Sequence, residues 1–284
     1  MSEAEQSWRI QRAGNILTAL SEYLQLANIS GLDVESFTSA LNESSVPTIG
    51  LAISGGGTQS GIGGLGIYEA FDARSAAAQG ARTGGLLQLI MYMSGLSGGG
   101  AVTVSTVSSS NFSTVDEIRR AINFSTNYEV GPQGNQTAYF DQIFEDVGAK
   151  AESGFPVSVA DTFGRFWAQY LPESMRYANY SDMALPGTAF SSGEAPMPII
   201  VAAEVIPGRS PSMGGILYPN NGGNQSSAIF PLTSYEITPF EFGSWAGGRV
   251  QAFMPTQYLG TAMTNGSVQN SSECVVAFDK FSFV

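Results

Sequence analysis

Apolar positions recur at helical spacing through the first part of the chain. From Trp8 to Ala27 they return every three or four residues behind a Ser2-x-x-Glu5 capping box, which predicts a long amphipathic helix over 2–27. Further helices are predicted at 61–73, 114–123, 138–152 and 158–170. The connecting segments 28–47 and 74–85 are polar or rich in small residues, and they are expected to be loops.

Short apolar runs interrupt this helical pattern. Residues 48–53 and 86–93 predict two strands, and each runs into a glycine-rich segment, whereas 101–107 fits either a helix or a strand. After Pro196 the pattern of apolar residues predicts strands at 197–205, 229–237 and 275–284, separated by clusters of Gly, Asn, Pro and Ser. Nothing repeats internally, and no linker marks a domain boundary.

Composition narrows the chemistry of this chain. It has 284 residues, of which 43% are hydrophobic, so the chain is expected to be globular. The absence of histidine excludes histidine-containing catalytic triads and histidine-ligated metals, and a single cysteine excludes an internal disulfide. Twelve Lys and Arg against 24 Asp and Glu give a net charge of −12, which argues against a nucleic-acid partner.

N-glycosylation sequons are far more frequent than chance predicts. Nine asparagines lie in N-x-[ST], which indicates a glycoprotein of the secretory pathway. They are Asn28, Asn42, Asn111, Asn123, Asn135, Asn179, Asn224, Asn265 and Asn270. The first residues nevertheless lack the pattern of a signal peptide, so the sequence is expected to start late, and no apolar stretch is long enough to span a membrane.

The sharpest chemical signal is Gly95-Leu-Ser97-Gly-Gly99. A G-x-S-x-G pattern behind an apolar strand is typical of a nucleophile elbow, in which a tight turn exposes the serine hydroxyl and the next helix directs its amino terminus there. The alternative is an ordinary turn in a chain that contains 34 glycines.

A second glycine run, Ser54-Gly-Gly-Gly57, follows the earlier strand. Consecutive glycines allow several backbone amides to converge on one point, as an oxyanion hole requires. The competing interpretation is a nucleotide site, because residues 61–66 spell G-x-G-x-x-G. That motif starts well past the strand and no P-loop lysine follows it, so a nucleotide is disfavoured.

Without histidine, Ser97 needs another activating group, and a carboxylate in a Ser-Asp dyad is the natural candidate. Eight aspartates occur, and most fall on segments that predict helix faces or polar loops, where a solvated charge is the simpler interpretation. The residues alone therefore leave the partner of Ser97 open.

Several segments together resemble the fungal lysophospholipase (phospholipase B) family, whose catalytic domain is related to that of cytosolic phospholipase A2. They run in order from about Glu3 to Val284, so the combination is specific. The segments are IGLAISGGG (49–57), AFDAR (70–74), GGLLQ (84–88), YMSGLSGG (92–99), TPFEFGSW (238–245), PTQYLGT (255–261) and CVVAFD (274–279).

The resemblance implies a three-layer α/β fold with helices on both faces of a sheet, and residues 1–284 as the N-terminal part of a single catalytic domain. It implies that Ser97 is the nucleophile of a Ser-Asp dyad and that amides of Gly55, Gly56, Gly57 and Gly98 form the oxyanion hole. The expected substrate is a phospholipid or lysophospholipid at a lipid interface, cleaved through an acyl-serine intermediate with no metal or organic cofactor. The implied location is secreted or at the cell surface or cell wall.

Two departures from the family pattern change these expectations. The family has an arginine, thought to hold the substrate phosphate, where this chain has Gln59, and a neutral amide cannot replace a guanidinium. The family's dyad aspartate lies in a later Asp-Gly-Gly motif that the chain does not reach. The sequence is therefore expected to be a fragment, incomplete on the C-terminal side of its sheet and inactive or nearly so by itself, with Cys274 separated from any disulfide partner.

Two rival hypotheses remain. One is a non-catalytic lipid-binding or cell-wall glycoprotein with the same fold, which Gln59 favours and the intact Gly-Leu-Ser-Gly-Gly opposes. The other is a dyad completed within the chain, for which Asp279 is the least implausible partner.

Overall fold

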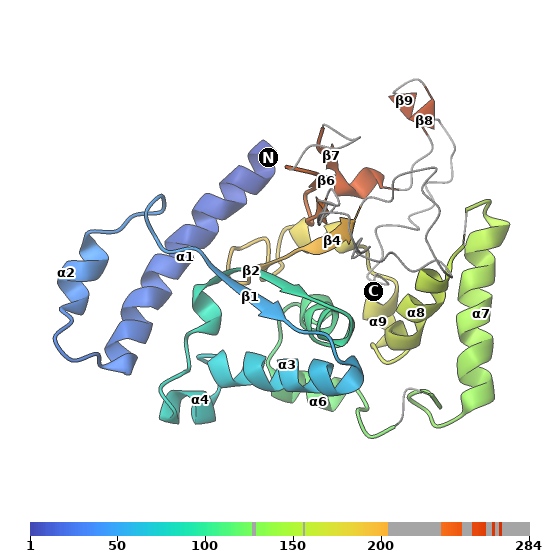
Figure 1. The fold of residues 1–284 in the computed structure, drawn as a ribbon, viewed down its shortest axis with the longest axis horizontal. Helices are drawn as coiled ribbons and strands as arrows, with labels where there is room; N and C mark the ends of the chain where they lie inside the picture. Colours follow the sequence, from blue (N-terminus) through green and yellow to red (C-terminus); the bar gives the residue numbers. More distant parts are fainter. Residues whose placement is uncertain are drawn as a thin grey trace, which may run out of the picture.

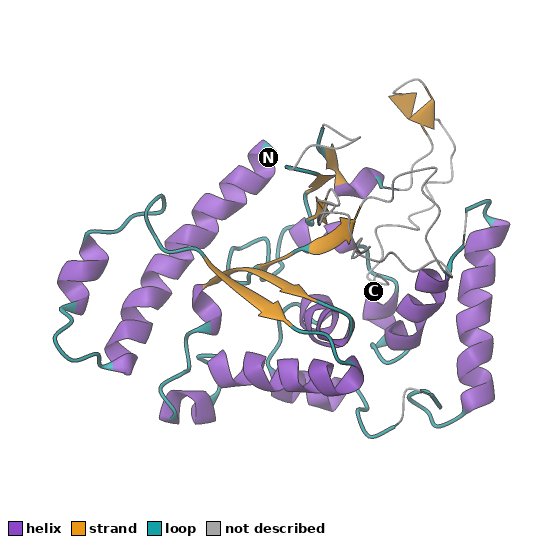
Figure 2. Cartoon of the chain, in the orientation of Figure 1, coloured by secondary structure: helices purple, strands orange, loops and turns teal. Residues whose placement is uncertain are grey.

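The structure of this chain is a computed structural model that describes residues 1–126, 129–155, 157–203, 234–245, 252–259, 263–264 and 267–268. Figures 1 and 2 show helices and strands alternating through its first half, with short strands dominating after residue 196. The α-helices are α1 (Glu3–Ala27), α2 (Val34–Ser39), α3 (Gly57–Phe71), α4 (Ala76–Gly80), α5 (Ser105–Ser109), α6 (Val115–Ala121), α7 (Gln136–Glu152), α8 (Val159–Ala168) and α9 (Glu173–Arg176).

Tighter or wider helical turns connect some of these elements. They are η1 (Leu87–Leu89), the π-helical turn η2 (Gly99–Val104), η3 (Tyr180–Ala184) and η4 (Thr256–Tyr258). The strands are β1 (Ile49–Ile53), β2 (Ile90–Gly95), β3 (Met197–Pro198), β4 (Ile200–Ala203), β5 (Ser234–Ile237), β6 (Glu241–Gly243), β7 (Met254–Pro255), β8 (Met263–Thr264) and β9 (Ser267–Val268).

The strands form open sheets of two kinds. β1, β2 and β3 make a parallel sheet with β2 in the centre, while β4 to β7 make an antiparallel sheet in chain order, and β8 pairs with β9. Figure 1 shows α1 on one side of the parallel strands and α3 with α6 on the other. The expected α/β fold with helices covering both faces of a sheet is therefore confirmed.

Most predicted elements occur with shifted ends. The helix over 2–27 is confirmed as α1, and the ambiguous segment 101–107 is helical. The predictions for 28–47 and 74–85 were wrong in part, because α2 and α4 form there, each begun by a side-chain cap from Asp33 or Ser75. The predicted strand 275–284, residues 204–205 of the strand predicted over 197–205 and residues 229–233 lie outside the described residues.

The predicted capping box of α1 is only half formed. The Ser2 hydroxyl accepts a hydrogen bond from the Glu5 amide at 3.2 Å, but the Glu5 carboxylate accepts one from Thr238 instead of returning to the cap. The Ser2 amide donates to Glu241 at 2.7 Å. Burial and the neighbouring Glu241 raise the pKa of Glu5. The first turn of α1 is therefore bonded to the segment around β5 and β6 in place of a complete local cap.

An aromatic cluster packs α1 against the segments that carry the later strands. The Trp8 ring stacks on Phe190 with centroids 4.8 Å apart, and Phe240 lies 5.5 Å from Phe190. The Trp8 indole also donates to the Phe190 carbonyl at 2.6 Å. This cluster holds residue 190, and with it the approach to β3, on the first helix of the chain.

The segments AFDAR (70–74) and GGLLQ (84–88) are joined by hydrogen bonds between buried polar side chains. The Asp72 carboxylate, 2% exposed, accepts hydrogen bonds from Arg74 and from Gln88 at 2.7–3.0 Å. Burial alone would raise the pKa of Asp72, but the bonds from Arg74 outweigh it and the pKa is lowered. These motif residues therefore fix the connection between α3 and β2 and lie apart from the glycine-lined strand ends.

Helix α3 lies so close to η2 that only glycine fits at Gly64. A Cβ there would stand 2.3 Å from the Thr103 hydroxyl and 2.9 Å from Ile53, whereas a Cβ at Gly66, one half-turn on, would meet nothing within 4 Å. We expect Gly64→Ala to lower stability by about 1–3 kcal/mol through overpacking. We expect Gly66→Ala to raise it by about 0.5–1 kcal/mol through helix propensity.

Thermal unfolding followed by circular dichroism separates the two variants, because their melting temperatures should move in opposite directions from that of the wild type. Equal shifts for both would show that α3 does not depend on close contact with η2.

Candidate active site

The two glycine-rich segments meet because their strands are parallel neighbours. β1 and β2 pair with Ile53 opposite Gly95, so both strands end at the same edge of the sheet. The Leu96 amide donates to the Ile53 carbonyl at 2.9 Å, one residue before Ser97. The segment that follows β1 is thereby brought against the turn that follows β2.

Ser97 occupies the turn between β2 and η2 in a strained backbone conformation. Its φ is +50°, a left-handed value that costs a non-glycine residue about 1–2 kcal/mol, and its side chain is exposed. The Ser97 carbonyl accepts from the Ala101 amide at 2.7 Å, so the helical run begins at this residue. The geometry is that of a nucleophile elbow, with the hydroxyl presented at a helix amino terminus.

The loop Gly55–Gly57 packs directly on this elbow. A Cβ on Gly98 would stand 1.9 Å from the Gly57 carbonyl oxygen, and a Cβ on Gly55 would stand 3.3 Å from the Cβ of Ser97. Within the described part of the chain, no hydrogen bond is made by the amides of Gly55, Gly56, Gly57 or Gly98. Unpaired amides beside an exposed serine hydroxyl are what an oxyanion hole requires.

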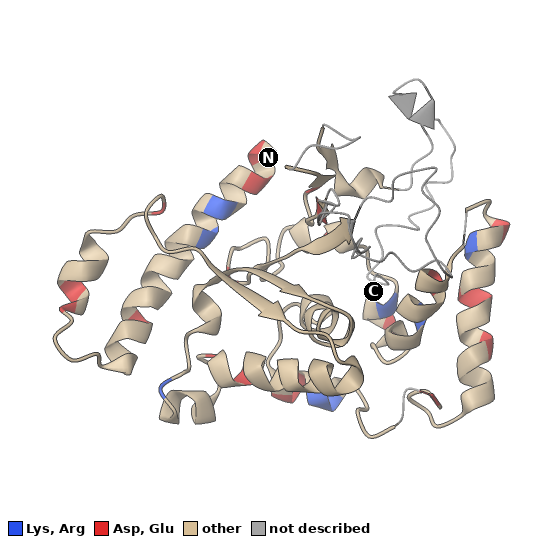
Figure 3. Cartoon of the chain, viewed as in Figure 1, with Lys and Arg blue, Asp and Glu red and all other residues tan. Residues whose placement is uncertain are grey.

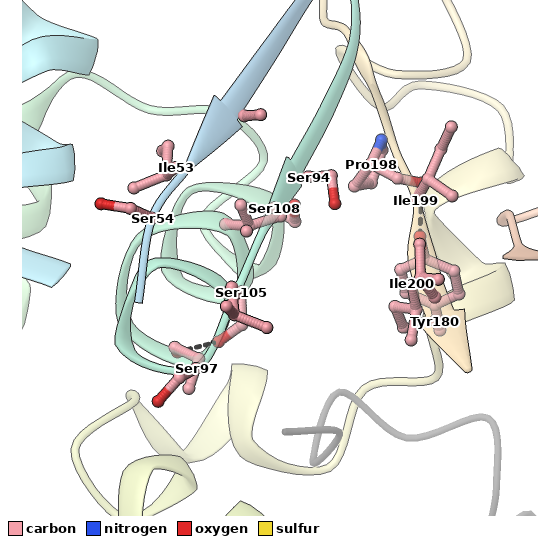
Figure 4. Close-up of a pocket in the computed structure, with 17 residues that line it drawn as sticks. Ile53, Ser54, Ser94, Ser97, Ser105, Ser108, Tyr180, Pro198, Ile199 and Ile200 are labelled. Carbon is pink, nitrogen blue, oxygen red and sulfur yellow. Dashed lines mark hydrogen bonds between the residues drawn. The ribbon is translucent and has the colours of Figure 1, made fainter. Parts of the chain in front are cut away.

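Ser97 lies at the edge of a cavity of about 690 Å³ (Figure 4). One wall is the helical run after Ser97, and the opposite wall is Tyr180 with the segment that joins β3 to β4. Most of the lining is apolar. The lining residues are 52–54, 94–97, 100–101, 104–105, 108, 180 and 198–201. A cavity of this size and character can hold an apolar chain.

The described residues that line the site carry no charge. Segments 44–68 and 83–115, which contain both strand ends, have no Asp, Glu, Lys or Arg, and in Figure 3 the ribbons of β1 and β2 are accordingly tan throughout. Among the described residues, no carboxylate lines the cavity and the Ser97 hydroxyl has no hydrogen-bond partner. Asp279 lies outside the described residues, so the partner of Ser97 stays a prediction.

The other predicted site residues are more dispersed. Gln59 lies exposed in the first turn of α3 and is not among the residues that line the cavity. Of the sequon asparagines within the described ranges, Asn179 is half-buried; the exposed ones are Asn28, Asn42, Asn111, Asn123 and Asn135. Asn224, Asn265, Asn270 and Cys274 lie outside the described residues.

The walls of the cavity were not predicted from the sequence. Along the helical run, Ala101, Val104 and Ser108 follow Ser97 at intervals of four, three and four residues, a spacing that places them on one helix face. That spacing was a usable signal. No local signal pointed to Tyr180 or to 198–201, because a tertiary contact brings them opposite the helix.

Within the described residues, no group of His, Cys, Asp and Glu could hold a metal ion, and none of the helices there is long and apolar enough to cross a membrane.

The chain is similar in sequence to known lysophospholipases. Lysophospholipase 2 of Saccharomyces cerevisiae is 34% identical over 300 residues, which cover 100% of this chain and 40% of that protein. Lysophospholipase 1 of Aspergillus fumigatus is 32% identical over 301 residues, covering 100% of this chain and 44% of that protein. The chain thus spans less than half the length of these relatives.

A solved structure shares the fold. Human GIVD cytosolic phospholipase A2 matches with a TM-score of 0.61 at 19% identity, over 95% of this chain and 30% of that chain. The family model described as the lysophospholipase catalytic domain matches residues 49–284, most of the chain. This chain therefore belongs to the lysophospholipase catalytic domain family, a family of lipid-ester hydrolases.

Proposed function

We propose that this chain carries the nucleophile of a lysophospholipase or phospholipase B, which cleaves fatty-acyl esters of lysophospholipids or phospholipids through an acyl-serine intermediate. One observation carries the proposal: Ser97, held at φ +50° at the edge of an apolar cavity, lies beside four backbone amides that make no other hydrogen bond among the described residues. Family membership supports the same chemistry.

In the proposed mechanism the Ser97 oxygen attacks the ester carbonyl, and its proton passes to a base that is none of the described cavity residues. Negative charge builds on the carbonyl oxygen, where the amides of Gly55–Gly57 and Gly98 and the amino end of α3 stabilise it. The glycerol oxygen then leaves with a proton, and water cleaves the acyl-serine to release the fatty acid. No step needs a metal or an organic cofactor.

The headgroup would be recognised without a guanidinium at position 59. Gln59 can donate only neutral hydrogen bonds, which are roughly half as strong as charge-assisted ones. We therefore expect phosphate to contribute less to substrate binding than it would with an arginine there, and the apolar cavity to contribute more.

The exposed sequons support a location along the secretory pathway. Glycans are attached at exposed asparagines, and five of the sequon asparagines in the described ranges are exposed. We propose that the protein is secreted or held at the cell surface or cell wall.

The alternative function is a lipid-binding protein without catalysis. The absence of a carboxylate from the described cavity lining and the replacement at Gln59 favour it. In that protein the cavity would bind a lipid while Ser97 remained an unactivated hydroxyl.

A long-chain alkyl fluorophosphonate tests the proposal, because it forms a covalent adduct only with an activated serine. The oxyanion amides retain part of the activation of a serine whose base is missing, so labelling should occur even though the chain by itself is expected to be inactive or nearly so toward substrate. We expect the intact chain to gain the mass of one probe slowly, on the peptide that contains Ser97, and lysophosphatidylcholine to slow the labelling further by competition. If lysophosphatidylcholine binds but no adduct forms, the non-catalytic alternative holds and the proposal is wrong.

A further inference from the structure

One tryptophan of the antiparallel sheet presents a large aromatic side chain to solvent, and the proposed mechanism does not use it. Trp245 follows β6 by two residues and is 60% exposed, although tryptophan is well buried on average in folded proteins. Its indole N–H donates a hydrogen bond to the Glu236 carboxylate, and its ring packs against Phe253 with the centroids 4.6 Å apart. These two contacts hold the indole in one orientation while most of it stays accessible.

The pairing of the strands brings these side chains together. Glu236 pairs with Gly243 across β5 and β6, and Trp245 projects from the same face because it lies two residues beyond Gly243. Gly243 has no side chain to fill this face, and a Cβ there would stand 2.4 Å from the Phe253 ring. The Phe253 ring therefore lies over the glycine, so a carboxylate and two aromatic rings share one face of the sheet.

The Glu236 carboxylate has no counter-ion within the described residues. Its side chain is half-buried, and none of the ion pairs in that part of the chain includes it. Burial, Glu241 and then Glu236 raise the pKa of Glu5, so the negative charge of Glu236 acts on its surroundings. An uncompensated carboxylate bonded to an exposed indole is a suitable partner for a cation from outside the chain.

This group of side chains adjoins the cavity. Val201 lines the wall opposite Ser97, is 60% exposed, and pairs with Glu236 across β4 and β5. Paired residues of antiparallel strands have Cβ atoms about 4.5–5.5 Å apart on the same face, so Glu236 lies one side chain beyond the edge of the cavity. A lipid with its ester at Ser97 and its headgroup directed to this wall would bring the headgroup to Trp245.

We propose that Trp245, Phe253 and Glu236 bind the trimethylammonium group of a choline headgroup, so that choline lysophospholipids are preferred over those with an uncharged or anionic headgroup. The inference rests on the proposed function, because it takes the cavity as the lipid site. A quaternary ammonium has no N–H to donate, and it is bound by the face of an aromatic ring and by a nearby negative charge. Since Gln59 offers the phosphate no charged contact, the ammonium is the headgroup charge that these residues can recognise.

Two amphiphiles without an ester test the inference independently of catalysis. They are dodecylphosphocholine and an analogue whose trimethylammonium is replaced by an uncharged tert-butyl group of the same shape. Calorimetric titration of the intact chain, below the concentrations at which micelles form, gives both affinities. We expect dodecylphosphocholine to bind about two- to thirtyfold more tightly, the range of a cation–π contact.

Substitutions then assign the preference to these side chains. Trp245→Leu should abolish it, and Glu236→Gln, which keeps an acceptor for the indole N–H, should reduce it. The leucine variant leaves the net charge unchanged, so a general repulsion of the anionic analogue would persist in it. Because Trp245 is exposed, its replacement should leave the fold intact, which circular dichroism checks.

Tyr258→Leu is the matched control, because Tyr258 is a 46% exposed aromatic residue of η4 that does not line the cavity. This variant should keep the preference for the choline form. Equal affinities of the wild type for the two amphiphiles, a preference that survives Trp245→Leu, or failure of both to bind would each overturn the inference. Fluorophosphonate labelling of Ser97 decides the proposed function separately: a chain that is labelled but shows no choline preference retains the function and loses this site.

Discussion

Ser97→Ala is expected to abolish fluorophosphonate labelling, slowing adduct formation by about a thousandfold or more, as loss of a catalytic nucleophile does in serine hydrolases. The adduct requires an oxygen at the turn after β2, where the hydroxyl is exposed and the glycine loop packs against the same turn. Ser39→Ala is the matched control, because Ser39 is an exposed serine at the end of α2 and does not line the cavity. Its labelling should equal that of the wild type.

A second substitution at the same position separates function from stability. Glycine adopts φ +50° freely, so Ser97→Gly should raise the free energy of unfolding by about 1 kcal/mol while also abolishing labelling. Ser97→Ala keeps the strain and should unfold like the wild type. Persistent labelling of either variant would show that another residue is the nucleophile. A Ser97→Gly variant less stable than the wild type would contradict the claim that the backbone at Ser97 is strained.

Arg12→Met is expected to lower the free energy of unfolding more than any other single substitution considered above. Arg12 lies in α1 with 1% exposure and donates five hydrogen bonds at 2.6–3.2 Å to the carbonyls of Gln88, Ile90, Gly193 and Glu194. Burial lowers the pKa of Arg12 to about 10, so the guanidinium stays charged at neutral pH. Methionine would fill the space but remove all five donors, which include the buried bonds to the Ile90 and Gly193 carbonyls and the part-buried bonds to those of Gln88 and Glu194.

We expect Arg12→Met to lower the free energy of unfolding by at least about 3 kcal/mol, a large part of the 5–15 kcal/mol typical of a folded protein. Urea unfolding measures the change. Arg9→Met is the control, because Arg9 lies on the same helix and, among the described residues, its only hydrogen bond goes to the Met1 sulfur. Equal losses for the two variants would show that the Arg12 bonds add nothing.

The same substitution should also reduce labelling of Ser97. Arg12 connects α1 to the start of β2 and to the turn at 193–194, which leads into β3 and the far wall of the cavity. Since β2 ends at the elbow, loss of this connection is expected to loosen both walls at once.

Local sequence was sufficient for much of the helical structure. The spacing from Trp8 to Ala27 predicts α1 because a long amphipathic helix repeats its apolar face many times, and the helix predicted over 114–123 occurs as α6, which a capping box of Thr114 and Glu117 begins. It failed at α2 and α4, where six and five residues are too few for a periodic pattern and a cap decides. It also misjudged the capping box of α1, because Thr238 binds Glu5 from 233 residues away.

The candidate site divides in the same way. Gly-Leu-Ser-Gly-Gly and Ser-Gly-Gly-Gly are local patterns, since the backbone of a tight turn depends on residues next to one another, so the sequence by itself determined the elbow, the loop and the family resemblance. Their contact follows from the parallel pairing of β1 with β2. Only the tertiary structure decided the cavity, because Tyr180 and 198–201 face the Ser97 helix through packing between segments about 100 residues apart, which no local pattern encodes.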